Sequence, residues 1–123
     1  MKLLLDTHIL LHALTEPERL SRQRRESIEN PANAVFVSAI SIAEVAIKVS
    51  IGKLSVDVDL LPAVEEAGFE WLDFSPREAH QLAELPLHHR DPFDRMLIVQ
   101  SQINDLTLVT DDSLIADYDC RIL

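Results

Sequence analysis

Three short and almost entirely apolar segments constrain the fold of this chain more than any other feature of its sequence. Residues 2–5, 34–37 and 106–109 each read as a β-strand with almost no polar face, which predicts burial on both sides. Segments with a helical spacing of apolar residues lie between them. Strands that alternate with helices form parallel sheets that the helices cover. The sequence therefore predicts an α/β fold, a three-layer α/β/α sandwich with a central parallel sheet.

The same patterns predict the other elements of the fold. Two further strands are expected at residues 69–74 and 121–123. Gly52 and Gly68 each follow a predicted helix, as is common where a helix ends. Helices are expected at residues 9–14, 21–29, 40–49, 60–67, 76–85, 91–103 and 113–118.

Length and composition favour one domain, residues 1–123, with an aliphatic core. Hydrophobic residues make up 47% of the chain and aromatic residues 5%. The single Cys120 excludes an internal disulfide and a zinc site built from several thiolates. Asp6 interrupts the leading run of leucines, so no signal peptide or membrane span is expected. We expect the protein in the reducing cytoplasm.

The charge of the chain limits how it can bind nucleic acid. Acidic residues number 21 against 11 lysines and arginines, which gives a formal net charge of −10. A protein that binds nucleic acid through a broad basic surface needs the opposite balance. Any chemistry on a nucleic acid must therefore rest on a local site.

Four acidic residues lie where predicted strands end or within the helices beside them. Asp6 follows the first strand and Asp112 follows the strand at 106–109, while Glu44 and Asp94 lie in flanking helices. Ligands of open parallel sheets bind beyond the carboxyl ends of the strands. We therefore expect the four carboxylates to converge at one edge of the sheet.

Carboxylates that converge in this way repel one another unless a cation lies among them. Two unit charges about 4 Å apart repel by about 4 kcal/mol at an effective dielectric constant of about 20. Oxygen ligands without histidine–cysteine pairs favour Mg²⁺ or Mn²⁺ over zinc. Such a metal activates water and stabilises charge on phosphate oxygens. The four acids thus predict a metal site that acts on phosphate esters.

Each of these acids also has a structural interpretation. Asp6 fits the N-cap of the helix that follows it. Glu44 can form a capping box with Ser41, or an ion pair with Lys48 four residues later. Ser38 is the better N-cap of that helix, which leaves Glu44 in the helix body among apolar residues. An unpaired carboxylate is costly there.

Asp91 and Asp94 form one pair of nearby acids, and Asp111 and Asp112 form another. In each pair, one acid is expected to have a structural role and the other to belong to the metal site. In the motif Asp-Pro-Phe-Asp, Asp91 is expected at the N-cap of the next helix, with proline at the first helical position. Asp94 is then the candidate ligand. Asp111 and Asp112 both fit a turn, and whichever points outward is expected to be the turn residue.

Several other polar residues are candidates for supporting roles. His8, His12 and His80 fall in helical patterns, and we expect packed or surface positions for them. The loop His88-His89-Arg90 is expected to be solvated rather than to contact a phosphate. Arg95 is expected to contact substrate or to hold a carboxylate in place. Three hydroxyls are candidates to orient the acids or bound water: Ser38, Thr7 and Thr110.

Four segments combine these acids with a characteristic apolar pattern: LLLDTHILLHAL at 3–14, VSAISIAEVAIKVSIGKL at 37–54, HHRDPFDRMLIVQS at 88–101 and LTLVTDD at 106–112. In order and spacing the chain resembles the PIN-domain nucleases, specifically the VapC-type toxins of bacterial toxin–antitoxin modules. The resemblance implies a PIN-like three-layer fold and a ribonuclease that cleaves RNA with Mg²⁺ or Mn²⁺. It also implies a homodimer and a small antitoxin partner.

The motifs of that family assign its catalytic and metal-binding acids to Asp6, Glu44, Asp94 and Asp112. The implied reaction is hydrolytic, with Asp6 and Asp94 holding the principal metal and the other two acids completing its ligands. A metal-bound hydroxide would attack phosphorus in line and leave a 5′-phosphate and a 3′-hydroxyl. Asp91 is assigned to capping and Asp111 to the turn. The antitoxin is expected to lay an inhibitory basic segment along the acidic cleft.

Two interpretations from other classes stay open on the sequence. A metal-dependent phosphatase or phospho-receiver domain fits the acids and the α/β pattern. Its Asp-x-Asp signature is missing, however, because Thr7 and His8 follow Asp6. A catalytically silent PIN fold that serves as a binding module is the other, although the presence of all four acids counts against it.

Overall fold

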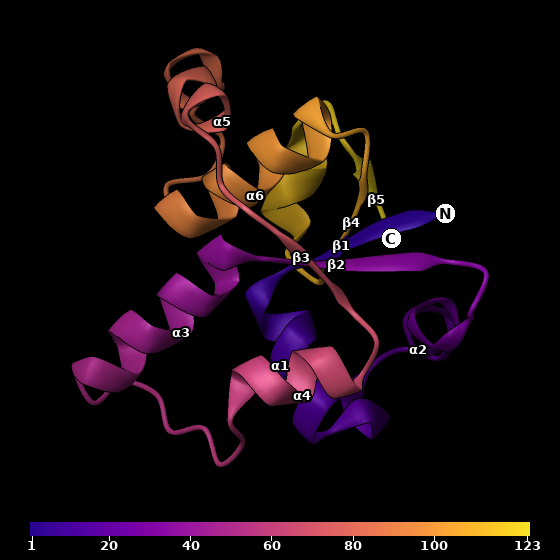
Figure 1. Cartoon of the computed structure of the whole chain (residues 1–123). Coiled ribbons are helices and arrows are strands. Elements are labelled where there is room, and N and C mark those ends of the chain that lie inside the picture. Colours follow the sequence, from indigo (N-terminus) through magenta and orange to yellow (C-terminus); the bar gives the residue numbers. More distant parts are fainter.

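The computed structural model describes the whole chain, Met1 to Leu123, as a parallel sheet covered by helices (Figure 1). Five strands lie in the order β3-β2-β1-β4-β5, and each neighbouring pair is parallel. β1 is therefore central, and Asp6 follows it at the middle of the carboxyl edge. The strands are β1 (Lys2–Leu5), β2 (Ala34–Ser38), β3 (Glu70–Leu72), β4 (Thr107–Val109) and β5 (Arg121–Ile122).

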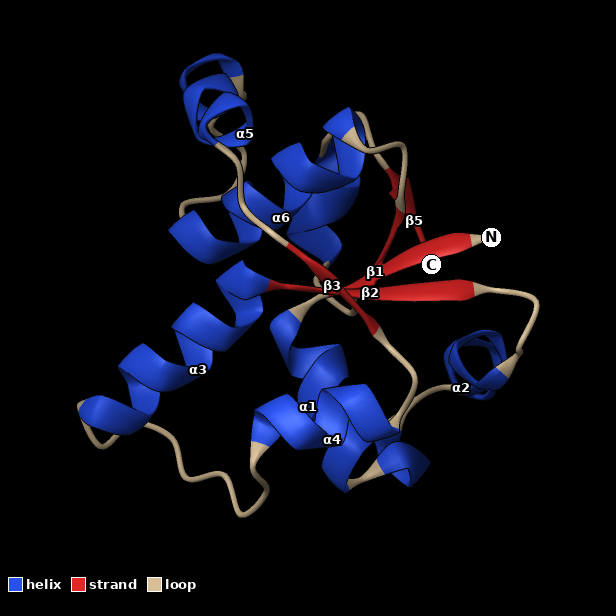
Figure 2. Cartoon of the chain, viewed as in Figure 1, coloured by secondary structure: helices blue, strands red, loops and turns tan.

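Helices cover both faces of the sheet, which confirms the predicted three-layer α/β/α sandwich. Figure 2 shows α5 and α6 on one face and α1, α2 and α4 on the other, while α3 leaves the carboxyl end of β2. None of these helices has the length and hydrophobicity that a membrane span requires. The helices are α1 (Thr7–Thr15), α2 (Arg22–Glu29), α3 (Ala39–Ser50), α4 (Leu60–Glu66), α5 (Pro76–Gln81) and α6 (Pro92–Ile103).

Two predicted α-helices are partly or wholly 3₁₀-helical. The helix predicted at 76–85 is α-helical to Gln81 and ends in a 3₁₀ turn, because Pro86 disfavours helical backbone at the residue before it. The segment predicted at 113–118 is 3₁₀-helical, since this single capped turn is too short to sustain an α-helix. A further 3₁₀ turn covers Pro17–Arg19.

β1 divides the apolar interior into two clusters, because its side chains alternate between the faces of the sheet. Leu4 belongs to one cluster, together with residues of α6 and β4 such as Leu97 and Leu108. Leu3 and Leu5 belong to the other, together with residues of α1, β2 and α4. All three leucines of β1 are completely buried. The prediction that this strand is buried on both faces is confirmed.

A buried glutamine ties α6 to the carboxyl edge of the sheet. Gln100 is completely buried, hydrogen-bonds the Ser38 hydroxyl, and donates from its amide nitrogen to the Asp73 carbonyl at 3.1 Å. Ser38 also accepts a hydrogen bond from the Ile40 N–H at 3.0 Å, so it is the N-cap of α3, as predicted. The helix that carries Asp94 is thereby fixed to the ends of β2 and β3.

Replacing Gln100 with leucine should lower the free energy of unfolding by about 1–3 kcal/mol, because the Ser38 hydroxyl and the Asp73 carbonyl lose a buried partner. Urea unfolding followed by circular dichroism measures the loss. Gln102→Leu on the same helix is the matched control. Its amide donates to the Asp119 carbonyl at an exposed site, and a change within about 0.5 kcal/mol is expected. Equal losses in both variants would contradict the role given to Gln100.

Candidate metal centre

The four acids singled out in the sequence line one pocket at the carboxyl edge of the sheet. Asp6 follows β1, Glu44 lies in α3, Asp94 in the first turn of α6, and Asp112 after β4. The structure thus brings the four acids together. The pocket has a volume of about 340 Å³ and no apolar residue in its wall, which consists of Asp6, Thr7, His8, Glu44, Lys48, Asp91, Asp94, Asp111 and Asp112.

Asp6 combines a structural role with a place in the pocket. Its Oδ1 atom accepts a hydrogen bond from the Ile9 N–H at 2.8 Å, which makes it the N-cap of α1. Burial raises the pKa of its carboxyl, although hydrogen bonds from Thr110 and from the Ile9 backbone oppose the shift. Capping and pocket lining coexist, because the helix cap uses only one carboxylate oxygen.

Glu44 has one carboxylate oxygen in an ion pair and one without any partner. Its Oε2 lies 2.6 Å from the Lys48 Nζ, and this hydrogen bond raises the pKa of Lys48. Its Oε1 is buried and accepts no hydrogen bond. Ser41 does not form the alternative capping box, since the Thr7 hydroxyl donates to it and Ser38 caps the helix. A buried carboxylate oxygen without a partner is costly unless a cation or a water supplies one.

Asp94 is the acid that its surroundings perturb most. Burial raises the pKa of Asp94 to about 7, helped by the negative charges of Asp91, Asp6 and Glu44 and opposed by His89. Asp91 is the N-cap of α6, as predicted, because its Oδ1 accepts a hydrogen bond from the N–H two residues later at 2.9 Å. It also lines the pocket and adds its charge to it.

The adjacent acids Asp111 and Asp112 have different partners. Asp112 caps the following 3₁₀ turn through Oδ1, which accepts a hydrogen bond from the Leu114 N–H at 2.9 Å. Its Oδ2 lies 2.7 Å from Nε2 of His89. Asp111 is more exposed and forms an ion pair with Arg24. The assignment of Asp112 to the site and of Asp111 to the turn stays a prediction, because both line the pocket.

The expectation that the loop 88–90 is solvated is wrong for His89. Only 12% of its side chain is exposed, and Nε2 lies 2.7 Å from Oδ2 of Asp112 and 3.0 Å from Oδ2 of Asp94. Its Nδ1 accepts a hydrogen bond from the Asp91 N–H at 3.2 Å, so a neutral ring carries its proton on Nε2. With Nε2 unprotonated instead, His89, Asp94 and Asp112 would offer ligand atoms within 4.8 Å of one another, a spacing that suits a metal ion.

Tyr118 and Arg95 hold the loop of His89 in place. The Tyr118 hydroxyl accepts hydrogen bonds from the N–H groups of His88 and His89, at 2.9 and 2.8 Å. Arg95 does not hold a carboxylate and is not in the pocket wall, while its expected contact with substrate stays a prediction. Its guanidinium donates instead to the carbonyls of Pro86, Leu85 and His89 itself, at 2.8, 3.1 and 3.4 Å. The one local signal for His89 in the sequence is its position two residues before the N-cap Asp91.

Of the three hydroxyls expected to orient the acids, only that of Thr110 contacts them. Its oxygen accepts a hydrogen bond from the Asp112 N–H at 3.0 Å, and the hydroxyl hydrogen-bonds Asp6. The Thr7 hydroxyl donates to another hydroxyl, and that of Ser38 serves α3 and the buried glutamine of α6. The expectation that Thr7 and Ser38 orient the acids is therefore wrong, while their orientation of bound water stays a prediction.

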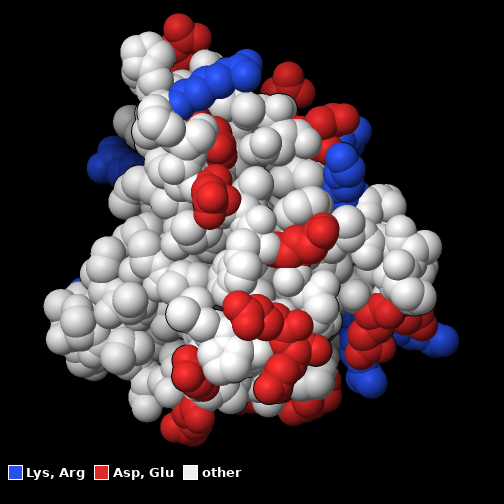
Figure 3. Space-filling view, in the orientation of Figure 1, with Lys and Arg blue, Asp and Glu red and all other residues white.

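The donor set of the pocket fits a hard divalent cation. Six of its residues are carboxylates, the ligands that Mg²⁺ and Mn²⁺ prefer, and Lys48 is its only lysine or arginine. The Oε1 atom of Glu44, which has no hydrogen-bond partner, is free to coordinate such an ion. Elsewhere on the face seen in Figure 3, lysines and arginines are scattered and form no continuous basic patch. This face therefore offers a phosphate chain no continuous basic surface.

Solved structures with a similar fold include several VapBC assemblies. VapBC2 from Rickettsia felis, bound to a DNA fragment from its promoter, gives a TM-score of 0.74 at 17% identity, covering 100% of this chain and 98% of that one. DNA-bound VapBC from Salmonella typhimurium gives 0.72 at 19% identity, covering 100% and 97%. VapBC-5 from Mycobacterium tuberculosis, a member of the VapBC family of toxin–antitoxin systems, gives 0.59 at 20% identity, covering 99% and 95%.

Comparison of the sequence identifies the protein family more specifically than these structural similarities do. No curated protein matches the sequence significantly. Identities of 17–20% to the solved structures show a shared fold alone. The family model of the PIN domain, however, matches residues 3–119, which is nearly the whole chain. The chain therefore belongs to the PIN domain family.

Proposed function

We propose that this chain is a metal-dependent endoribonuclease that acts as the toxin of a toxin–antitoxin module. Asp6, Glu44, Asp94 and Asp112 would form its active site, and Mg²⁺ or Mn²⁺ would be its cofactor. One observation carries the proposal: the four acids line one small pocket in which a buried oxygen of Glu44 has no partner. Membership of the PIN domain family and the fold shared with VapBC assemblies support it.

The residues in and around the pocket would have different roles in phosphodiester hydrolysis. A metal held by the four acids would supply activated water and stabilise charge on the leaving oxygen. Lys48, with 43% of its side chain exposed, would contact a phosphate oxygen of the RNA. His89 would keep the carboxylates of Asp94 and Asp112 oriented through its Nε2 proton. Tyr118 would hold His89 in that position through the loop backbone.

The proposed partner is a small antitoxin with a basic segment. Arginine or lysine side chains of that segment would pair with the pocket acids, which outnumber the single lysine six to one. The similar VapBC structures support a two-protein assembly, since one of them is described as a member of a toxin–antitoxin family. We extend the proposal to a homodimer, as the sequence resemblance implies, and to action in the cytoplasm, as cysteine usage suggests.

Incubation of the pure protein with labelled single-stranded RNA, in Mg²⁺, Mn²⁺ or EDTA, tests the activity. Cleavage is expected with either metal and not in EDTA, and the products should carry a 5′-phosphate. Metal binding without cleavage of any RNA would favour a silent binding module. Hydrolysis of p-nitrophenyl phosphate without RNA cleavage would favour a phosphatase. Either result would overturn the proposed function.

Asp91→Asn and Asp94→Asn should separate helix capping from catalysis. Asparagine caps a helix about as well as aspartate, so Asp91→Asn should keep its fold and most of its RNA cleavage. Asp94→Asn puts a neutral amide where a hard cation needs a carboxylate, so cleavage should fall by orders of magnitude. Cleavage assays and melting curves in EDTA measure both effects. If Asp91→Asn were inactive and Asp94→Asn active, the metal ligand would be Asp91 and the assignment of Asp94 would be wrong.

Mn²⁺ should stabilise the folded protein, because it binds the folded pocket and not the separated acids of the unfolded chain. At a hundredfold excess of metal over Kd the gain is about 2.7 kcal/mol. Thermal melting at low ionic strength measures it, with Asp94→Asn as the variant that should lose the gain. A melting temperature that does not change in millimolar Mn²⁺ would count heavily against a shared metal site.

The metal-free protein should lose stability as the pH rises, because folding raises the pKa of Asp94 from 3.8 to about 7. Between these values the folded carboxyl keeps a proton that the unfolded chain has released, so this contribution is full below 3.8 and lost above about 7. In EDTA, Asp94→Asn should therefore raise the melting temperature more at about pH 8 than at about pH 5. A larger gain at the lower pH would contradict the assignment.

A further inference from the structure

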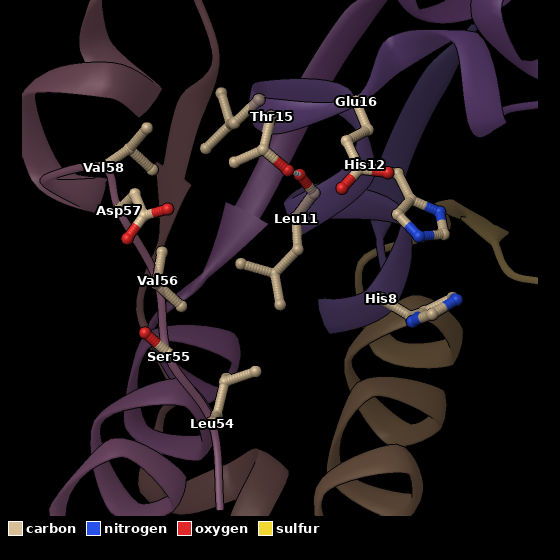
Figure 4. A pocket seen from close by; sticks show the side chains of 11 residues that line it. His8, Leu11, His12, Thr15, Glu16, Leu54, Ser55, Val56, Asp57 and Val58 are labelled. Atoms are coloured by element: carbon tan, nitrogen blue, oxygen red, sulfur yellow. Dashed lines mark hydrogen bonds between the residues drawn. The ribbon is translucent and has the colours of Figure 1, made fainter.

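A second and larger cavity adjoins the acidic pocket. It has a volume of about 560 Å³ and lies between α1 and the segment 54–58 that follows α3 (Figure 4). His8 lines both this cavity and the acidic pocket, so the two share a wall. A volume of this size is typical of sites that bind small organic molecules. Nothing in the proposed cleavage reaction uses it.

Figure 4 shows two different walls with apolar side chains between them. His8 and His12 lie on one side, with ring centroids 4.2 Å apart and an edge-to-face arrangement. Asp57 lies on the opposite side, and Leu11 and Leu54 lie between. His8 is exposed and His12 is half-buried, in agreement with the surface or packed positions expected for them.

The acidic groups in the wall of this cavity are not balanced by a lysine or arginine. The carboxylates of Glu16 and Asp57 are in its wall, and no lysine or arginine is. Nδ1 of His12 is buried and has no hydrogen-bond partner. Glu16 is engaged only by the exposed Arg19, at 3.3 Å from Oε2. Such a cavity repels phosphate and suits an uncharged ring that carries N–H donors.

We propose that this cavity binds a nucleobase of the RNA strand next to the cleaved phosphate, and that it prefers guanine. The inference rests on the ribonuclease function proposed above. Recognition of single-stranded RNA commonly stacks a base on an aromatic or imidazole ring and hydrogen-bonds its Watson–Crick edge. His8 and His12 supply the rings, and Glu16 and Asp57 supply the acceptors.

Guanine is preferred because of the donors on its edge. Its N1–H and exocyclic N2–H lie side by side, which matches the two oxygens of one carboxylate. Adenine, cytosine and uracil each present one donor group there, flanked by acceptors that a carboxylate repels. The shared wall at His8 would place the bound base beside the acids that act on the adjoining phosphate.

Nucleosides test the cavity without metal and without catalysis. The imidazole proton resonances of His8 and His12 are followed in EDTA while guanosine, adenosine, cytidine or uridine is added. Guanosine should shift both resonances saturably and more than the other three. The exposed His80 of α5 is the internal control and should not move. The inference would be overturned if none of the four nucleosides shifted the His8 and His12 resonances. It would also be overturned if only a lysine- and arginine-rich peptide shifted them.

Cleavage of a random-sequence RNA pool tests the same cavity in the working enzyme. Mapping of product ends should reveal a guanine preference at one fixed position beside the cleaved bond. His12→Ala should reduce that preference by about tenfold, as should one of Glu16→Gln and Asp57→Asn, whichever removes the carboxylate that holds the guanine edge. Cleavage of RNA without base preference should persist in these variants.

Asp59→Asn is the matched control, because this exposed acid lies near the segment 54–58 but outside the cavity wall. It should leave the preference unchanged. Guanosine binding without any RNA cleavage would contradict the proposed nuclease function alone. Cleavage with no guanine preference and silent histidine resonances would contradict the nucleobase site alone.

Discussion

The mutual repulsion of carboxylates gathered at the centre of a parallel sheet is the constraint on which this structure depends. Six acids line one pocket, and burial, helped by the charges of Asp91, Asp6 and Glu44, raises the pKa of Asp94 to about 7. The chain offsets much of this cost locally. Asp6, Asp91 and Asp112 each use one oxygen to cap a helical segment, and Lys48 pairs with Glu44. An oxygen left without a partner, such as the Oε1 of Glu44, is available to a divalent cation.

The fold was predictable where local pattern decides it. The apolar runs at 2–5 and 106–109 predict strands buried on both faces, and the structure has them at the centre of the sheet. The acids at their ends could be picked out for the same reason. Strand order was not predictable, because contacts between segments distant in sequence set it. The Ser38–Gln100 contact, which spans 62 residues, is one example.

His89 shows where sequence reasoning about the site stops. A histidine in a short polar loop suggests a solvated residue, but Tyr118 and Arg95 fold this loop against the pocket. Both interactions are side-chain contacts to backbone groups, and they leave no periodic pattern in the sequence. The resulting 2.7 Å approach to Asp112 makes His89 part of the same electrostatic unit as the acids. A purely carboxylate description of the centre is therefore incomplete.

The central claim is that these carboxylates share a divalent cation, and anomalous diffraction from crystals soaked in MnCl₂ tests it most directly. An anomalous peak is expected within direct coordination distance of oxygens of Asp6, Glu44 and Asp94, with the Oε1 of Glu44 turned toward it. A fully occupied crystal with no peak in this pocket, or with manganese only at exposed acids such as Asp105, would contradict the account.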